Sequence, residues 1–162
     1  MSAQTPESRS VRRIREAAAA LGLSIQVRRF PEGTRTAPDA ARAVGCDVGQ
    51  IVKSLVFMAD GRPLLALTSG ANRVDVGKLA VLAGSSEVRR ASAEEAREAT
   101  GFAIGGTPPF GHARPLTVLV DRDLLGYDVV WAAAGTPDAV FALSPHERLR
   151  VSGGLPAGFR EE

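Results

Sequence analysis

The chain has 162 residues, of which 44% are hydrophobic and 23% charged, as expected for one soluble globular domain. Its single cysteine excludes a disulfide framework, and its two histidines are too few for most structural metal cages. The formal net charge of +2 is compatible with a nucleic-acid partner but does not require one. There is no apolar run near the roughly 20 residues of a membrane span and no signal-peptide core, so we expect a cytoplasmic protein without a membrane partner.

The first third of the chain mixes helix and strand signals. Residues 1–9 are polar, and we expect a flexible N-terminus there. Apolar residues recur at helical spacing over 10–21, whereas 24–30 alternates like a strand. Thr36 is placed to cap a short helix over 37–44, with a proline in its first turn.

The clearest pattern is a hairpin in the middle of the chain. Two apolar runs, 51–59 and 63–68, flank the turn dipeptide Asp60-Gly61. The remaining expected elements are helices over 75–83, 93–100 (capped by Ser92) and 145–149, and strands over 87–90, 116–120, 128–133 and 139–143. Residues from Gly153 onward read as a loop-like tail. Because hairpin-linked strands are mixed with helices irregularly, the pattern predicts an α+β, mixed-sheet fold in one compact domain.

Several familiar catalytic motifs are missing. The sequence contains neither a G-x-S-x-G nucleophile elbow nor an H-E-x-x-H zinc motif. The loop 106–111 has the glycine spacing of a P-loop, but His112-Ala113 replaces the lysine and hydroxyl pair. A nucleotide phosphate cradle of that type is therefore not expected.

Lys53 is the first unusual residue, because it interrupts a strand that otherwise reads as buried. Burying an ammonium group without a partner is costly. Lys53 therefore either lies on the exposed face of an edge strand, with its stem covering apolar surface, or lines a pocket and meets an anion such as a phosphate.

The second candidate is the glycine- and proline-rich loop 105–111. Its glycines allow close approach of a ligand, and its backbone amides could stabilise charge on a carbonyl oxygen. A tight turn between helix and strand explains the same composition.

Other polar residues have two interpretations each. His112 could be a general base or a loop histidine, and Cys46 is more simply a small thiol than a nucleophile. Asp121 and Asp123 could form a paired carboxylate site, although helix capping suits them better. The segment 135–138 is most simply a hairpin turn.

Taken in order, these segments resemble the YbaK/prolyl-tRNA-synthetase-associated editing domain family. The resemblance rests on Gln50–Phe57, Leu65–Gly70, Asp75–Leu79, Gly105–Gly111, Asp121 and Gly135–Pro137. It covers residues 10–154, with 155–162 left as a C-terminal tail. It implies a central, mostly antiparallel, strongly curved mixed sheet flanked by helices, and hydrolysis of the ester that links a wrong amino acid to tRNA.

The resemblance also assigns residues. Lys53 matches the family's strand lysine beside the tRNA end, and Gly105 and Pro109 match its Gly-x-x-x-Pro loop. It implies catalytic roles for Lys53, Gly105 and Gly106, and substrate binding by Phe30, Thr68, Gly70, Thr107, Pro108, Pro109, Phe110, Gly135 and Asp138. It implies no metal and no cofactor. Relatives carry a histidine where this chain has Asp138, which leaves the role of that position open.

The function implied is a free-standing, trans-editing aminoacyl-tRNA deacylase. Its partners would be the acceptor end of a mischarged tRNA and an aminoacyl-tRNA synthetase, with alanine, serine, threonine or cysteine as the amino acid removed. The alternative is a catalytically idle relative that binds tRNA or docks onto a synthetase. An intact Lys53 and an intact 105–109 loop favour the enzyme.

Overall fold

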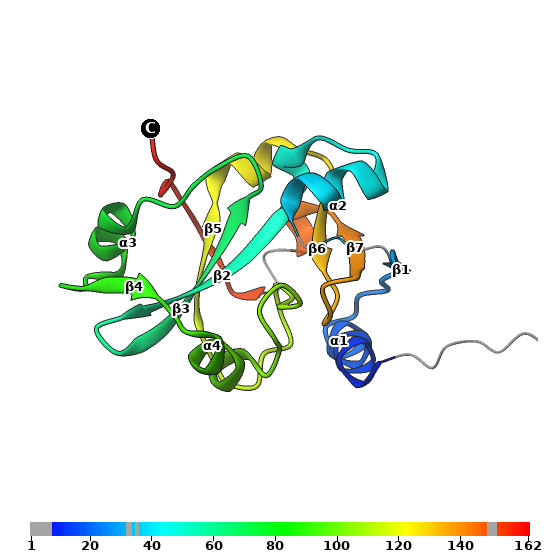
Figure 1. Cartoon of the computed structure of the whole chain (residues 1–162), viewed down its shortest axis with the longest axis horizontal. Coiled ribbons are helices and arrows are strands. Elements are labelled where there is room, and N and C mark those ends of the chain that lie inside the picture. Colours follow the sequence, from blue (N-terminus) through cyan, green and yellow to red (C-terminus); the bar gives the residue numbers. More distant parts are fainter. Residues whose placement is uncertain (1–7, 32–33, 35, 149–151) are drawn as a thin grey trace, which may run out of the picture.

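The computed structural model describes residues 8–31, 34, 36–148 and 152–162, and its strands form two sheets (Figure 1). The larger sheet has the order β4-β2-β3-β5-β8 and the smaller one β1-β7-β6. Their strands are β1 (Val27–Arg29), β2 (Val52–Ala59), β3 (Arg62–Ser69), β4 (Val88–Arg90), β5 (Thr117–Asp121), β6 (Val130–Ala133), β7 (Ala139–Leu143) and β8 (Leu155–Ala157). Most pairs are antiparallel, but β3–β5 and β5–β8 are parallel, so the mixed α+β prediction is confirmed.

The prediction of one central sheet needs correction, because the strands divide between two. A parallel bridge between Ile51 and Trp131 joins the two sheets. The strand β4 pairs only with Phe57–Ala59, the C-terminal end of β2. The N-terminal part of the same edge, Val52–Val56, is therefore not paired with β4, and the larger sheet does not continue into β6.

The hairpin of β2 and β3 is confirmed. Its two turn residues, Asp60 and Gly61, have φ angles of 49° and 80°. Two left-handed residues make the kind of tight turn whose twist matches that of the strands, and this geometry explains the Asp-Gly pair. The Asp60 carboxylate also accepts hydrogen bonds from the backbone N–H groups of Ser86 and Glu87, so it anchors the turn to the segment before β4.

Side-chain caps begin each of the longer helices. The helices are α1 (Arg9–Ala20), α2 (Ala37–Val44), α3 (Val76–Ala83), α4 (Ala93–Thr100) and the short α5 (Pro145–Arg148), with 3-10 turns at Val48–Gln50 and Arg122–Gly126. Ser8 caps α1, which places the last two residues of the expected flexible N-terminus in or beside a helix. Residues 1–7 and Leu149 lie outside the described residues.

Two hydrophobic clusters cover the two faces of the larger sheet. On one face Val52 and Val56 join α1, β5 and the smaller sheet. On the other, Phe57 and Ala59 pack with Leu79 of α3. Figure 1 shows α1 and α3 at opposite ends of the molecule. Because alternate residues of a strand face opposite ways, odd-numbered Lys53 is directed to the α3 side.

The sequence suggested a loop-like C-terminal tail, and this prediction was wrong, because the C-terminal residues complete the larger sheet. The strand β8 pairs in parallel with β5, and Phe159 is fully buried. Beyond it, Arg160 forms an antiparallel bridge with Val74, and the N–H of Asp75 donates to the Phe159 carbonyl oxygen. The segment 155–162 thus holds the loop that precedes α3. This pairing is between residues far apart in sequence, which local patterns do not reveal.

Candidate functional site

A cavity of about 400 Å³ lies between the open edge of β2 and the smaller sheet. Small-molecule sites typically range from about 300 to 1,000 Å³, so the cavity has room for a small ligand. Its wall is mostly small and apolar, with a few hydroxyl and cationic groups. The polar lining side chains are Thr34, Thr36, Lys53, Ser54, Arg90 and Thr107.

The cavity exists because β2 lacks a neighbour along its first half. Only Phe57–Ala59 pair with β4, whereas Val52–Val56 line the cavity. Just past β4, the N–H of Ala91 donates to the Val56 carbonyl oxygen. Backbone groups two residues apart point to the same edge of a strand, so those of Ser54 are directed toward the cavity. A ligand there meets backbone as well as side chains.

Lys53 lies at the rim of this cavity and is half-buried. Its Nζ donates a hydrogen bond of 2.6 Å to the carbonyl oxygen of Asn72, in the loop after β3. Thr68, its partner in the β2–β3 register, is fully buried and donates to the Ala66 carbonyl oxygen. The sequence left two positions open for Lys53, the exposed face of an edge strand or the wall of a pocket, and the structure places it on a pocket wall.

Burial lowers the pKa of Lys53 below its ordinary value, and repulsion from Arg73 and Arg90 lowers it further. The carboxylate of Asp121 opposes this shift. Lys53 and Arg90 in the cavity wall, with Arg73 close enough to repel Lys53, produce a positive potential, which attracts anionic groups such as phosphates. Because Asp121 partly offsets the lowering of the pKa, the Lys53 ammonium keeps its proton to a higher pH than it would without this carboxylate.

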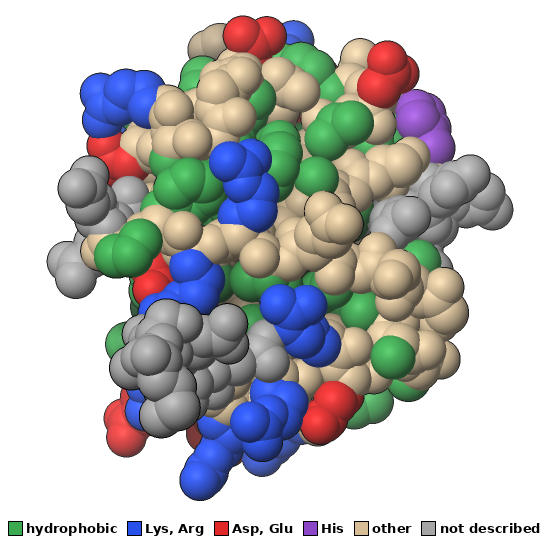
Figure 2. Space-filling view, turned by 90° about the vertical axis from the view of Figure 1, so that its right-hand side faces the viewer, with side chains coloured by type: hydrophobic (Ala, Val, Ile, Leu, Met, Phe, Trp, Pro, Cys, Tyr) green, Lys and Arg blue, Asp and Glu red, His purple; other side chains and the backbone are tan. Residues whose placement is uncertain are grey.

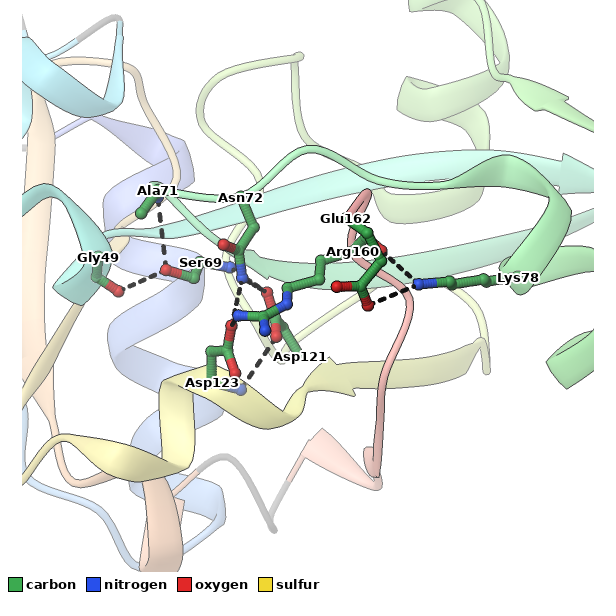
Figure 3. Close-up of polar contacts among 9 residues, drawn as sticks. All are labelled: Gly49, Ser69, Ala71, Asn72, Lys78, Asp121, Asp123, Arg160 and Glu162. Carbon is green, nitrogen blue, oxygen red and sulfur yellow. Dashed lines mark hydrogen bonds and ion pairs between the residues drawn. The ribbon is translucent and has the colours of Figure 1, made fainter.

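Asp121 is the centre of a polar network (Figure 3), which includes Asn72, the residue whose carbonyl oxygen accepts the hydrogen bond from Lys53. This carboxylate is only 2% exposed and accepts hydrogen bonds from the Ser69 N–H and the Asn72 side-chain amide. The same amide donates to Asp123, which also pairs with Arg160 at 2.6 Å. Asp121 also caps the 3-10 turn through the Asp123 N–H, so capping is confirmed and is one of several roles. The network fixes the loop whose carbonyl holds Lys53.

Gly70 and Gly105 belong to the cavity wall for different reasons. A side chain at Gly70 would lie 2.4 Å from the Val48 carbonyl oxygen, so only glycine fits there. Gly105 has a φ of +87°, a left-handed conformation that favours glycine, and it is exposed at the wall. Thr107 lines the same wall and is 3% exposed.

Gly106 is placed differently from Gly105. Its N–H donates to the Ala103 carbonyl oxygen, and its own carbonyl accepts from the Gly135 N–H. A side chain at Gly106 would approach the Gly135 backbone to 2.7 Å. Neither glycine lines the cavity, and their contact locks the loop against the β6–β7 turn. Of the two loop glycines, only Gly105 lines the cavity.

The rest of the predicted loop packs into the protein. Pro108, Pro109 and Phe110 are buried and do not line the cavity; the Phe110 ring meets Phe141 edge-on with 5.8 Å between centroids. The ring of His112 lies 2.8 Å from the Pro108 carbonyl oxygen in a separate depression, and burial lowers its pKa. These positions stabilise the loop.

The other predicted residues lie around the rim. Asp138 accepts a hydrogen bond from the Thr136 hydroxyl and pairs with Arg29 at 3.3 Å; the first of these contacts is the main cause of its lowered pKa. Its neighbour Pro137 lines the cavity instead. The Phe30 N–H donates to the Asp138 carbonyl oxygen, which places Phe30 beside this turn. Cys46 is not among the lining residues, and burial raises the pKa of its thiol.

Several lining residues escaped the sequence analysis. The Oγ of Ser54 is buried and finds no hydrogen-bond partner among the described residues, which leaves it available to a ligand. Trp131 and Arg90 also line the cavity. The polar interruption of an apolar strand was the available signal for Ser54. Nothing local marked Trp131, whose position depends on the bridge between the sheets.

The described lining residues include no His, Cys, Asp or Glu. Across the described chain, no group of three or more such residues is placed to hold a metal ion. In the same part of the chain, no helix is long and apolar enough to cross a membrane. The polar groups that the cavity does offer, hydroxyls and the cations Lys53 and Arg90, can orient a substrate and a water molecule.

Comparison with known proteins agrees with this geometry. Residues 31–151 match the family model of the aminoacyl-tRNA editing domain. A solved structure described as a candidate trans-editing enzyme for prolyl-tRNA synthetase is 49% identical, with a TM-score of 0.91 over 97% of this chain and 100% of the other.

Two curated relatives extend the comparison. The uncharacterized protein YwhH of Bacillus subtilis is 32% identical over 122 residues, 75% of this chain and 77% of that protein. A proline–tRNA ligase of Limosilactobacillus fermentum is 32% identical over 99 residues, 58% of this chain. The match spans only 17% of the ligase, so the likeness is to one segment of that enzyme.

Proposed function

The chain belongs to the aminoacyl-tRNA editing domain family, and we propose that it is a deacylase that acts in trans on mischarged tRNA. It would hydrolyse the ester between a wrong amino acid and the terminal ribose. The full-length match to a candidate trans-editing enzyme supports action as a free-standing protein.

The observation that carries this proposal is the convergence of Lys53 and Gly105 on one cavity. They come from a strand and a loop about fifty residues apart, and both belong to motifs that the sequence analysis singled out. A cation at the rim suits the phosphates of an RNA end, and a glycine in the wall lets a carbonyl group approach its backbone amide closely. Neither residue alone would distinguish an editing site from an ordinary cleft.

In the proposed step, water attacks the carbonyl carbon of the aminoacyl ester. The bond from that carbon to the ribose oxygen breaks, and the ribose oxygen takes up the proton. The products are the free amino acid and a tRNA with a free terminal hydroxyl. The Gly105 amide would stabilise the developing negative charge on the carbonyl oxygen, and Lys53 would hold the RNA end in place. No protein nucleophile is needed, because an activated ester requires only modest catalysis.

Cavity size would set the choice of amino acid. The wall includes Ala37, Ala40 and Ala133, and Ser54 presents a hydroxyl that has no partner among the described residues. Such a site suits alanine, serine, threonine or cysteine. A hydrophobic pocket distinguishes one methylene by only about 1–3 kcal/mol, which is why a second, hydrolytic site improves fidelity.

The test is deacylation of tRNA charged with each of these four amino acids, on proline tRNA and on other acceptors. We expect one or two of the amino acids to be released rapidly by the wild type. Correctly charged tRNA serves as the control and should stay intact. Binding of these tRNAs without any release would replace the enzyme by the idle, tRNA-binding alternative.

A further inference from the structure

The smaller sheet presents one face to the cavity. Val140 of β7 lies opposite Arg28 of β1 and Ala133 of β6 in the strand register. Directly paired residues project from the same face of a sheet. Val140, Ala133 and Trp131 line the cavity, so Arg28 belongs to the face that forms this wall.

Arg28 lies between two aromatic rings on this face. Its guanidinium carbon is 5.2 Å from the ring centroid of Phe30 and 5.4 Å from that of Trp131. Both distances fall within the roughly 6 Å range of cation–π contacts. Arg28 is exposed and both rings are half-buried, so the group is reachable by a ligand. Viewed from the side of β1 and α1, Lys and Arg side chains are interspersed with hydrophobic ones (Figure 2).

We propose that Arg28 and Trp131, with Phe30 beside them, form a stacking site for a nucleobase at the single-stranded 3′ end of the RNA substrate. This inference rests on the proposed function. Unpaired bases of RNA stack on aromatic rings and on guanidinium planes, and such stacking tolerates any base. A base held here would lie next to the cavity, because Trp131 belongs to both.

The arrangement separates two tasks at one site. The cavity between β2 and the smaller sheet would receive the aminoacyl group, and the aromatic group would hold the adjoining nucleotide. Lys53 and Arg90, which also line the cavity, would neutralise the 5′ phosphate of that terminal nucleotide. An ester anchored by its nucleotide is positioned for hydrolysis whatever its side chain, which leaves selection to the cavity.

The chain offers a direct reporter, since Trp131 is its single tryptophan. We would titrate the full chain with an uncharged acceptor-stem minihelix and follow tryptophan fluorescence at fixed salt. Saturable quenching is expected with an intact single-stranded 3′ end. A minihelix lacking those terminal nucleotides should quench at least about tenfold more weakly. Equal quenching by both RNAs, or by neither, would overturn the proposal.

Deacylation kinetics supply the second readout. Trp131→Ala and Arg28→Gln should each raise KM by about tenfold with little change in kcat, and Trp131→Phe should stay near wild type because it keeps a ring. Arg62→Gln, which removes an exposed arginine at the far end of the hairpin, is the matched control for charge. Unchanged KM in both site variants would overturn the proposal while the deacylase stands. Quenching without deacylation would instead retain the stacking site and reject the enzyme.

Discussion

Lys53 Nζ donates a 2.6 Å hydrogen bond to the carbonyl oxygen of Asn72, and this contact joins β2 to the loop that follows β3. The loop is held from behind by Asp121 and from beside by the C-terminal segment. The ammonium group therefore has a defined position at the cavity rim before any substrate arrives. Preorganised charge of this kind costs no rearrangement during the reaction.

Lys53→Ala should lower deacylation by about 100-fold or more, because it removes the cation that would hold the RNA end. The fold should survive, since the side chain is only half-buried and belongs to none of the hydrophobic clusters of the described residues. Lys78→Ala is the matched control, because Lys78 is the other lysine of the chain. Lys78 lies on α3, pairs with Glu162 and does not line the cavity. Deacylation at the wild-type rate in Lys53→Ala would remove this residue from the mechanism.

Activity should also depend on pH through Lys53. Burial and two nearby arginines hold its pKa below the ordinary value of 10.5. Deacylation, corrected for spontaneous hydrolysis, should therefore fall as the pH rises through that lowered pKa, earlier than for an ordinary lysine. Lys53→Arg should shift or abolish this decline, because a guanidinium does not lose its proton in this range.

Unfolding would not explain such a decline. The unfolded chain binds the Lys53 proton more tightly than the folded chain, so this group makes the protein more stable as the pH rises through the window. A melting temperature followed over the same pH range would check the sign. A fall in stability that tracks the fall in activity would contradict the assignment to Lys53.

Asp121→Asn should affect both stability and activity. It places an amide where one carboxylate oxygen accepts hydrogen bonds from Ser69 and Asn72, and a buried donor facing other donors costs about 1–3 kcal/mol. Urea denaturation would measure the loss. Deacylation at a temperature where the variant is fully folded should still be reduced, since the Asn72 loop positions Lys53. Asp123 accepts a hydrogen bond from the same Asn72 amide but is more exposed than Asp121. Asp123→Asn should therefore lower both stability and deacylation by less.

Ser54→Ala should separate stability from function. The buried hydroxyl has no partner among the described residues, and an unsatisfied polar group of this kind costs about 1–3 kcal/mol. Removing it should leave the free energy of unfolding equal or higher, while the KM for the preferred aminoacyl-tRNA rises. Ser152→Ala, outside the cavity lining, is a serine control. A destabilised variant with unchanged KM would show that the hydroxyl serves the fold.

Local signals predicted much of this structure. The Asp60-Gly61 turn and the caps at Thr36 and Ser92 set the limits of elements because their hydrogen bonds are made within a few residues. Lys53 stood out for a similar reason, as a charge in an apolar strand. Each of these features is decided by residues close in sequence.

Features decided at long range were missed. The division into two sheets depends on where β4 stops along β2, and Trp131 joins the site where β6 bridges to Ile51. The family motif grouped Phe110 with the substrate-binding residues, whereas its ring packs against Phe141 in the core. A motif shows which segment matters; which side chains reach the cavity is decided by packing.

The C-terminal strand also bears on how the domain behaves when it is cut. The family match ends at residue 151, but β8 and Phe159 follow it and cover the outer edge of β5. A chain shortened to the matched residues would leave Leu119–Asp121 as an unpaired sheet edge. Such edges pair with other chains, so the shortened protein should aggregate during expression even though every residue of the cavity is present.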